Sequence, residues 1–100
     1  GASAETGKVL TLNYNGWLYD STAADNKGVQ FASSLTSGQI TFTAGDGSVI
    51  AGWEQGVIGM REGGLRRLTI PPSLGYGASR YSIIPPNATL IFELELVKVE

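Results

Sequence analysis

The closing stretch TLIFELELVKVE, residues 89–100, decides the fold class of this chain. Leucine and phenylalanine recur there at every second position, and two of the residues between them are glutamates. Side chains alternate between the two faces of a β-strand, so this pattern predicts a central strand with one buried face. The buried face would carry Leu90, Phe92, Leu94 and Leu96, and the opposite face Glu93 and Glu95.

Three further segments carry the strand signal. VLTLNYN (residues 9–15) and ITFT (40–43) alternate apolar and polar side chains, and a shorter run at 65–70 ends at two prolines, which cannot donate to a β-ladder. DSTAADNKG (20–28) is polar and rich in turn formers, which predicts an exposed connection. One-sided alternation of this kind is typical of an antiparallel sheet.

A single segment has helical spacing. Trp53, Val57 and Met60 stand at i, i+4 and i+7, while glycines at positions 52, 56 and 59 keep the helix short. The predicted fold is therefore α+β, a twisted antiparallel sheet wrapped around one short α-helix, with the tryptophan where the helix meets the concave side of the sheet.

Length and composition limit the classes of protein. One hundred residues predict one domain over 1–100, with residues 1–6 disordered or left by cloning. No apolar run approaches the roughly 20 residues that span a bilayer. A net charge of -2 provides no positive electrostatic field that would attract nucleic acid. Because a chain without cysteine folds in cytoplasm and periplasm alike, the compartment stays open.

The missing residue types exclude most catalytic chemistry. Without histidine or cysteine there is no histidine-based triad, no thiol nucleophile and no ligand set of the usual zinc type, so we expect neither metal nor cofactor. A noncovalent reaction remains, namely rotation about an amide bond, whose barrier is about 18 to 20 kcal/mol. Xaa-Pro bonds are its natural substrates, and a dry apolar pocket favours the twisted form because water stabilises the planar one.

Three segments carry a resemblance to a known family. VIAGWEQGVIGM, RRLTIPPSLGYGA and IIPPNATLIFELEL closely resemble, in order and spacing, the signature segments of FKBP-type peptidyl-prolyl cis-trans isomerases over residues 7–100. The stretch WLYDSTAADNKGVQF has the expanded loop of bacterial members. The resemblance implies an isomerase of Xaa-Pro bonds that acts on proline-containing polypeptides and also binds macrolides of the rapamycin type.

The resemblance also implies a role for each pocket residue. Trp53 would form the floor on which a proline ring lies, and the Ile50 N–H would donate to a bound carbonyl. The implied walls are Tyr14, Phe31 and Phe92, the aliphatic lining is Ile40, Val49 and Ile84, Tyr76 offers a hydroxyl at the rim, and Tyr81 lies in the overhanging loop. From the residues alone, such aromatics would be assigned to the core, where we keep Phe42.

Two positions depart from the family pattern. Ala32 follows Phe31 where the family usually has an aspartate facing the pocket, and the next loop also lacks the common basic partner, so no buried charge is left unpaired. We expect a weakened isomerase, and the alternatives are a proline-segment or macrolide-binding module and a folding chaperone.

The second departure lies at the amino end, where GASAETGK leaves no room for an additional first strand. An exposed sheet edge would follow. A monomer is expected, with a strand-exchanged oligomer as the alternative.

Overall fold

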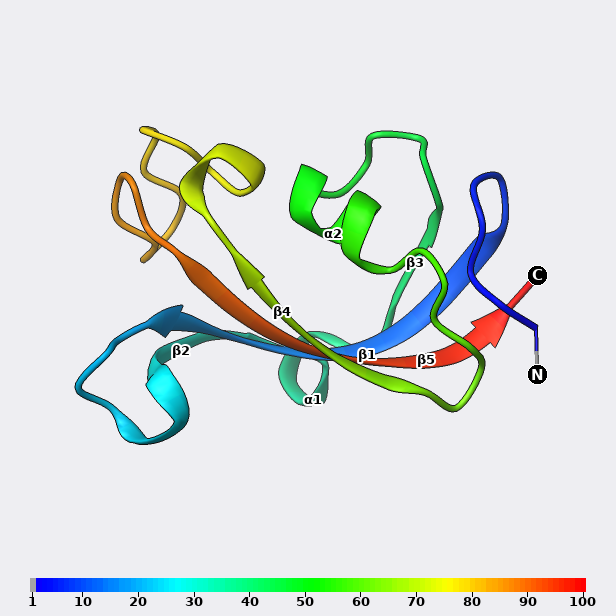
Figure 1. The fold of residues 1–100 in the computed structure, drawn as a ribbon, viewed down its shortest axis with the longest axis horizontal. Helices are drawn as coiled ribbons and strands as arrows, with labels where there is room; N and C mark the ends of the chain where they lie inside the picture. Colours follow the sequence, from blue (N-terminus) through cyan, green and yellow to red (C-terminus); the bar gives the residue numbers. More distant parts are fainter. Residues whose placement is uncertain (1) are drawn as a thin grey trace.

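The computed structural model describes residues 2–100 and has the α+β architecture that the sequence predicts. Five antiparallel strands form one sheet, which curves around a short helix, α2 (Figure 1). The strands are β1 (Val9–Tyr19), β2 (Lys27–Ser33), β3 (Ile40–Thr43), β4 (Leu65–Ile70) and β5 (Leu90–Val99), the helices are α1 (Ser34–Ser37) and α2 (Ala51–Gly56), and two 3-10 turns lie at Ala24–Asn26 and Pro72–Leu74.

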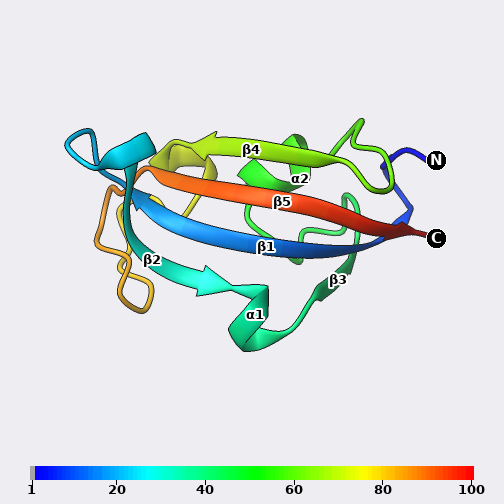
Figure 2. The ribbon, with the colours of Figure 1, turned by 90° about the horizontal axis from the view of Figure 1, so that it is seen from below.

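The closing strand is central in the sheet, as its alternation predicts. The strand order is β2-β1-β5-β4, and β3 pairs with β1 beyond the end of β2 (Figure 2). The predicted inward residues of β5 are all at most 4% exposed, namely Leu90, Phe92, Leu94 and Leu96. β4 stands at one end of this order. No helix of the described residues is long and apolar enough to cross a membrane.

Several boundaries differ from the sequence-based expectation. β1 continues to Tyr19, and β2 begins at Lys27, inside the segment predicted as a loop. α2 ends at Gly56, although Val57 and Met60 are still buried in the turn that follows. The short helix around which the sheet curves is α2, as predicted, and four further residues form α1, which is too short for any periodicity to reveal it.

The amino-terminal segment also differs from the predicted disorder. Residue 1 lies outside the described residues. Ala4 is fully buried, its N–H donates to the Met60 carbonyl at 2.7 Å, and its carbonyl accepts from the Gly59 N–H at 2.9 Å. Ser3 forms a bridge with Arg61. Residues 2–4 are thus held on the turn after α2, because a small side chain and its backbone groups find partners there.

The segment between β1 and β2 is tied to the convex side of the sheet by charge. The Arg67 guanidinium on β4 donates to both a carboxylate oxygen and the backbone carbonyl of Asp25, each at 2.6 Å. The Lys27 ammonium lies 3.4 Å from the Asp25 carboxylate and 2.8 Å from that of Glu93 on β5. These contacts anchor the segment at the end of the sheet where Ile91, the neighbour of Phe92, is fully buried.

The Asp25 contacts predict a dependence of stability on pH. Hydrogen bonds from Arg67 and then from Lys27 hold the pKa of the Asp25 carboxyl below its usual 3.8. A lowered pKa in the folded state contributes stability that is present above the unfolded pKa and is lost as the pH falls through the folded one. We expect Asp25→Asn to remove this part of the acid sensitivity, measured as the urea midpoint between about pH 6 and pH 2. Asparagine tolerates the positive φ of this position.

A matched variant separates this effect from general acid unfolding. Glu5→Gln removes a carboxylate that forms none of the ion pairs found among the described residues, so its midpoint should follow the wild type at every pH. An acid dependence of Asp25→Asn equal to that of the wild type would contradict the prediction.

Candidate functional site

Trp53 forms the floor of a pocket on the concave side of the sheet. α2 begins where the extended backbone of Ile50 turns, and the Ile50 carbonyl accepts from the N–H groups of Trp53 and Glu54 at 3.0 and 3.1 Å. The indole is 4% exposed and is surrounded by rings. It meets Tyr14 and Phe92 edge-on, with centroids 5.6 and 5.2 Å apart, and lies 6.2 Å from Phe42.

Phe31 and Phe92 form a second pair of rings above the sheet. Phe31 on β2 and Phe92 on β5 are edge-to-face, with centroids 5.4 Å apart and planes at 87°. Between them runs β1, and a Cβ on its Gly16 would lie 2.6 Å from the Phe92 ring. Only glycine fits at this position, which the sequence analysis did not identify.

Tyr14 stands where the neighbour of β1 changes. Asn15 still pairs with Ser33 of β2, whereas Leu12 pairs with Ile40 of β3, and α1 bulges out between these points. The Tyr14 N–H therefore lacks a strand partner on that side and donates instead to the Ser34 hydroxyl at 3.0 Å. This hydrogen bond fixes the wall of the pocket, and no sequence signal pointed to Ser34.

Two stacked tyrosines form the opposite rim. The rings of Tyr76 and Tyr81 are parallel within 3°, with centroids 4.4 Å apart. Burial, and secondarily the neighbouring Tyr81, raises the pKa of Tyr76 above its usual value, so its hydroxyl remains a donor at neutral pH. Tyr81 and Ile84 exchange backbone hydrogen bonds at 3.1 and 2.8 Å, which closes the short overhanging loop.

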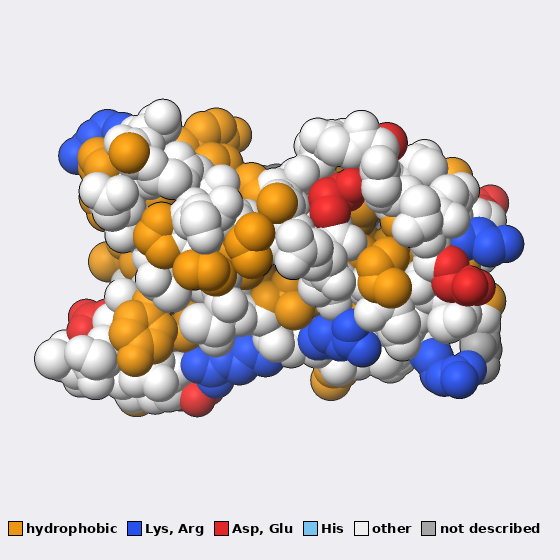
Figure 3. Space-filling model, turned by 45° about the horizontal axis from the view of Figure 1, so that its top comes forward, with side chains coloured by type: hydrophobic (Ala, Val, Ile, Leu, Met, Phe, Trp, Pro, Cys, Tyr) orange, Lys and Arg blue, Asp and Glu red, His pale blue; other side chains and the backbone are white. Residues whose placement is uncertain are grey.

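The structure brings every residue predicted for the site around this one pocket of about 690 Å³. The surface has a groove between the segment 72–88 and the part of the molecule that contains α2 (Figure 3). Hydrophobic side chains gather below this groove in the same view. The lining consists of Tyr14, Phe31, Ala32, Ile40, Val49, Ile50, Trp53, Tyr76, Tyr81, Ile84 and Phe92, together with Gly47, Ser48 and Ser82, which the sequence analysis missed. The predicted site residues therefore lie around one pocket, and the role of each of them stays a prediction.

The lining of this pocket is neutral. No acidic or basic side chain of the described residues lines it, and Ala32 occupies the position where a carboxylate was expected. The Trp53 indole N–H is buried without a hydrogen-bond partner among the described residues. Such a pocket suits an apolar ring of a ligand, with hydroxyls and backbone N–H groups at its rim as donors. No cluster of potential metal ligands occurs in the part of the chain that the structure describes.

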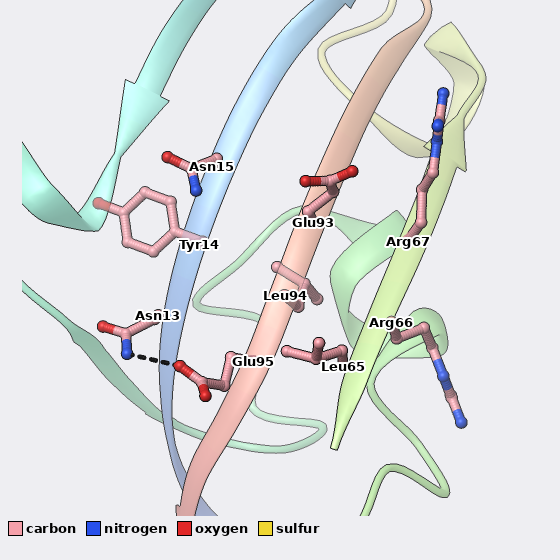
Figure 4. A pocket seen from close by; sticks show the side chains of 9 residues that line it. All are labelled: Asn13, Tyr14, Asn15, Leu65, Arg66, Arg67, Glu93, Leu94 and Glu95. Carbon is pink, nitrogen blue, oxygen red and sulfur yellow. Dashed lines mark hydrogen bonds between the residues drawn. The ribbon is translucent and has the colours of Figure 1, made fainter. Parts of the chain in front are cut away.

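A second hollow, of about 450 Å³, lies on the strands β1, β5 and β4 (Figure 4). Its lining is largely polar and charged, with Asn13 donating to Glu95 at 2.9 Å. Leu65, beside these groups, is 79% exposed. Figure 4 shows the Tyr14 side chain directed away from Glu93 and Glu95. Solvated polar side chains cannot enclose an apolar ring, so we assign the functional site to the aromatic pocket.

Comparisons with known proteins agree with this geometry. The family model described as FKBP-type peptidyl-prolyl cis-trans isomerase matches residues 1–97. An "FK506-binding protein" of Neisseria meningitidis serogroup C is 52% identical over 99% of this chain and 86% of the relative. The mouse protein "Peptidyl-prolyl cis-trans isomerase FKBP2" is 47% identical over 94% of this chain and 64% of its own length. The crystal structure of FkpA from Escherichia coli covers 100% of this chain and 43% of that chain, with a TM-score of 0.83 and 38% identity.

Proposed function

The chain belongs to the FKBP-type peptidyl-prolyl cis-trans isomerase family, and we propose that it rotates Xaa-Pro bonds by noncovalent means in the aromatic pocket. The observation that carries this proposal is the ring arrangement around Trp53, with Tyr14 and Phe92 edge-on to the indole. A proline ring placed on the indole would have its imide bond at the rim of the pocket.

The proposed mechanism needs neither acid nor nucleophile. A planar amide is charge-separated and is stabilised by water, whereas the twisted amide of the transition state is less polar. A pocket without charged lining therefore disfavours the planar ground state relative to the twisted form. The Ile50 N–H and the Tyr76 hydroxyl would hold the neighbouring carbonyls, so that only the imide bond turns.

A protease-free isomerisation assay on a proline tetrapeptide, with and without rapamycin, tests this function. Acceleration that rapamycin abolishes supports the isomerase. Binding without acceleration would support the alternative of a proline-segment or macrolide-binding module. Suppressed aggregation of an unfolded client whose prolines have been replaced would support a folding chaperone.

The proposed partners are proline-containing polypeptides and rapamycin-type macrolides, with the chain acting as a monomer. The position of β4 at the end of the strand order leaves strand exchange as the alternative. A mass in sedimentation that is independent of concentration would argue against exchange.

Ala32 is the residue whose replacement we expect to increase the activity. It lines the pocket next to Phe31, and a hydrogen bond to a charged group is worth about 1.5 to 3 kcal/mol. Ala32→Asp should raise kcat/KM roughly tenfold, if part of this energy is realised in the transition state. Ala32→Asn, similar in size and uncharged, is the control. An equal response of both variants, or none, would show that a carboxylate has no catalytic use at this position.

A further inference from the structure

One wall of the aromatic pocket is a segment without regular structure. Gly47, Ser48, Val49 and Ile50 line the pocket and belong to the connection between β3 and α2. The connection turns through Gly45 and Gly47, whose φ angles are +89° and +79°. Backbone of this kind is held neither by a ladder nor by helical hydrogen bonds, so its order in the free protein depends on individual contacts.

Two side chains hydrogen-bond to the backbone of this wall, within the part of the chain that the structure describes, and one of them comes from outside the connection. The Ser48 N–H donates to the Asp46 carboxylate at 2.9 Å, which is a contact inside the connection itself. The Gly47 N–H donates to a carboxylate oxygen of Glu54 on α2, at 3.2 Å. Glu54 also follows Trp53 directly, and both residues donate their N–H groups to the Ile50 carbonyl.

The other carboxylate oxygen of Glu54 is buried and has no hydrogen-bond partner among the described residues. An unpaired buried acceptor destabilises the folded protein, and an apolar side chain of similar length would avoid this cost. A residue that breaks a local rule in this way calls for a compensating role, and such positions are concentrated at functional sites. The contact with Gly47 supplies that role.

We propose that Glu54 is a positioning residue of the isomerase, because its carboxylate holds the Gly47–Ile50 wall in its binding geometry before substrate arrives. The inference rests on the proposed function, and it adds a residue that does not line the pocket. If the wall is ordered in only a fraction of free molecules, the apparent dissociation constant is the intrinsic one divided by that fraction. Loss of the Glu54 contact should therefore raise KM and the Kd of rapamycin by the same factor and leave kcat nearly unchanged.

Three variants test the proposal: Glu54→Ala, Glu54→Gln and, as control, Gln55→Ala at an exposed position of the same helix. We expect Glu54→Ala to raise KM and Kd roughly tenfold and to speed amide hydrogen exchange of Gly47, with the exchange of β5 unchanged. Glu54→Gln keeps a carbonyl acceptor and should restore most of both affinities.

Two results would overturn the proposal: unchanged KM and Kd in Glu54→Ala, or a loss of kcat and of global stability without faster exchange at Gly47. The exchange measurement needs no activity. If wild-type protein fails to accelerate isomerisation, the proposed function falls, whereas rapamycin affinity and exchange at Gly47 still decide whether Glu54 holds the wall.

Discussion

Trp53→Ala is expected to lower the free energy of unfolding by about 3 to 5 kcal/mol, the usual cost of removing a buried aromatic side chain. The indole is 4% exposed and contacts Tyr14, Phe42 and Phe92, so its removal leaves a cavity between the helix and the sheet. The free energy of unfolding of a domain of this size is about 5 to 15 kcal/mol in total. A fraction of the Trp53→Ala variant should therefore remain folded at low temperature.

The same variant should lose isomerase activity beyond its loss of stability. Without the floor, a proline ring is neither positioned nor shielded from water, and we expect kcat/KM to fall at least roughly tenfold under conditions where circular dichroism shows a folded protein. Trp53→Phe, which keeps an apolar ring, should retain an intermediate activity.

Trp17→Ala provides the matched control, because it also removes a tryptophan. The Trp17 ring lies under the Lys27 ammonium, 4.4 Å from its centroid, and does not line the pocket. Equal activities of Trp17→Ala and Trp53→Ala would mean that the floor position has no catalytic role, even if both variants were destabilised.

Most of the sheet could be predicted from the sequence, because the residues of β1, β3 and β5 alternate between apolar and polar over most of their length and those of β4 end at two prolines. β3 and β4 have the bounds that the alternation predicts, and β5 is the central strand. A period of two can be recognised from the residues of one strand alone, because every second side chain of a strand lies on the same face. β2 carries no comparable pattern, because two of its residues are exposed and the others are half-buried, and its turn-rich start predicts a loop.

The site could be placed only through the family resemblance. Its residues come from four strands, from α2 and from two connections, and spacing along the chain does not reveal which of them meet. The supporting contacts were missed for the same reason. Ser34 acts on Tyr14 of β1 from the start of α1, and Gly16 is needed only because two rings close over it.

The glycines of α2 show how a local reading can miss the reason for a residue. From the sequence alone, Gly52 and Gly56 predict only that the helix is short. In the structure, a Cβ on Gly52 would lie 2.6 to 2.8 Å from three atoms of the Ile70 side chain, and one on Gly56 would lie 2.5 Å from Leu68. These glycines let the helix backbone approach β4 closely, which sets the height of Trp53 above the sheet.

Gly52→Val is therefore expected to be among the most damaging single substitutions in this chain. Ile70 is 2% exposed and cannot swing away, so three added carbons must displace either it or the helix. Overpacking costs about 1 to 3 kcal/mol and occasionally more, and the β-branched side chain recovers little of this by helix propensity. We expect a loss of about 3 kcal/mol in urea unfolding, with a further fall in kcat/KM of the folded protein as Trp53 moves.

Two neighbours of this variant define the expected series. Gly52→Ala should lose less of the free energy of unfolding than Gly52→Val. Alanine clashes less with Ile70, and its higher helix propensity contributes up to about 1 kcal/mol of stability. Ala51→Val adds the same branched side chain at the exposed start of α2, where no more than about 0.5 kcal/mol should be lost. If Ala51→Val and Gly52→Val were equally destabilised, the cost would belong to valine in a helix. A larger loss of stability in Gly52→Val than in Ala51→Val, together with altered activity, would show that the loss arises in the contact between α2 and β4.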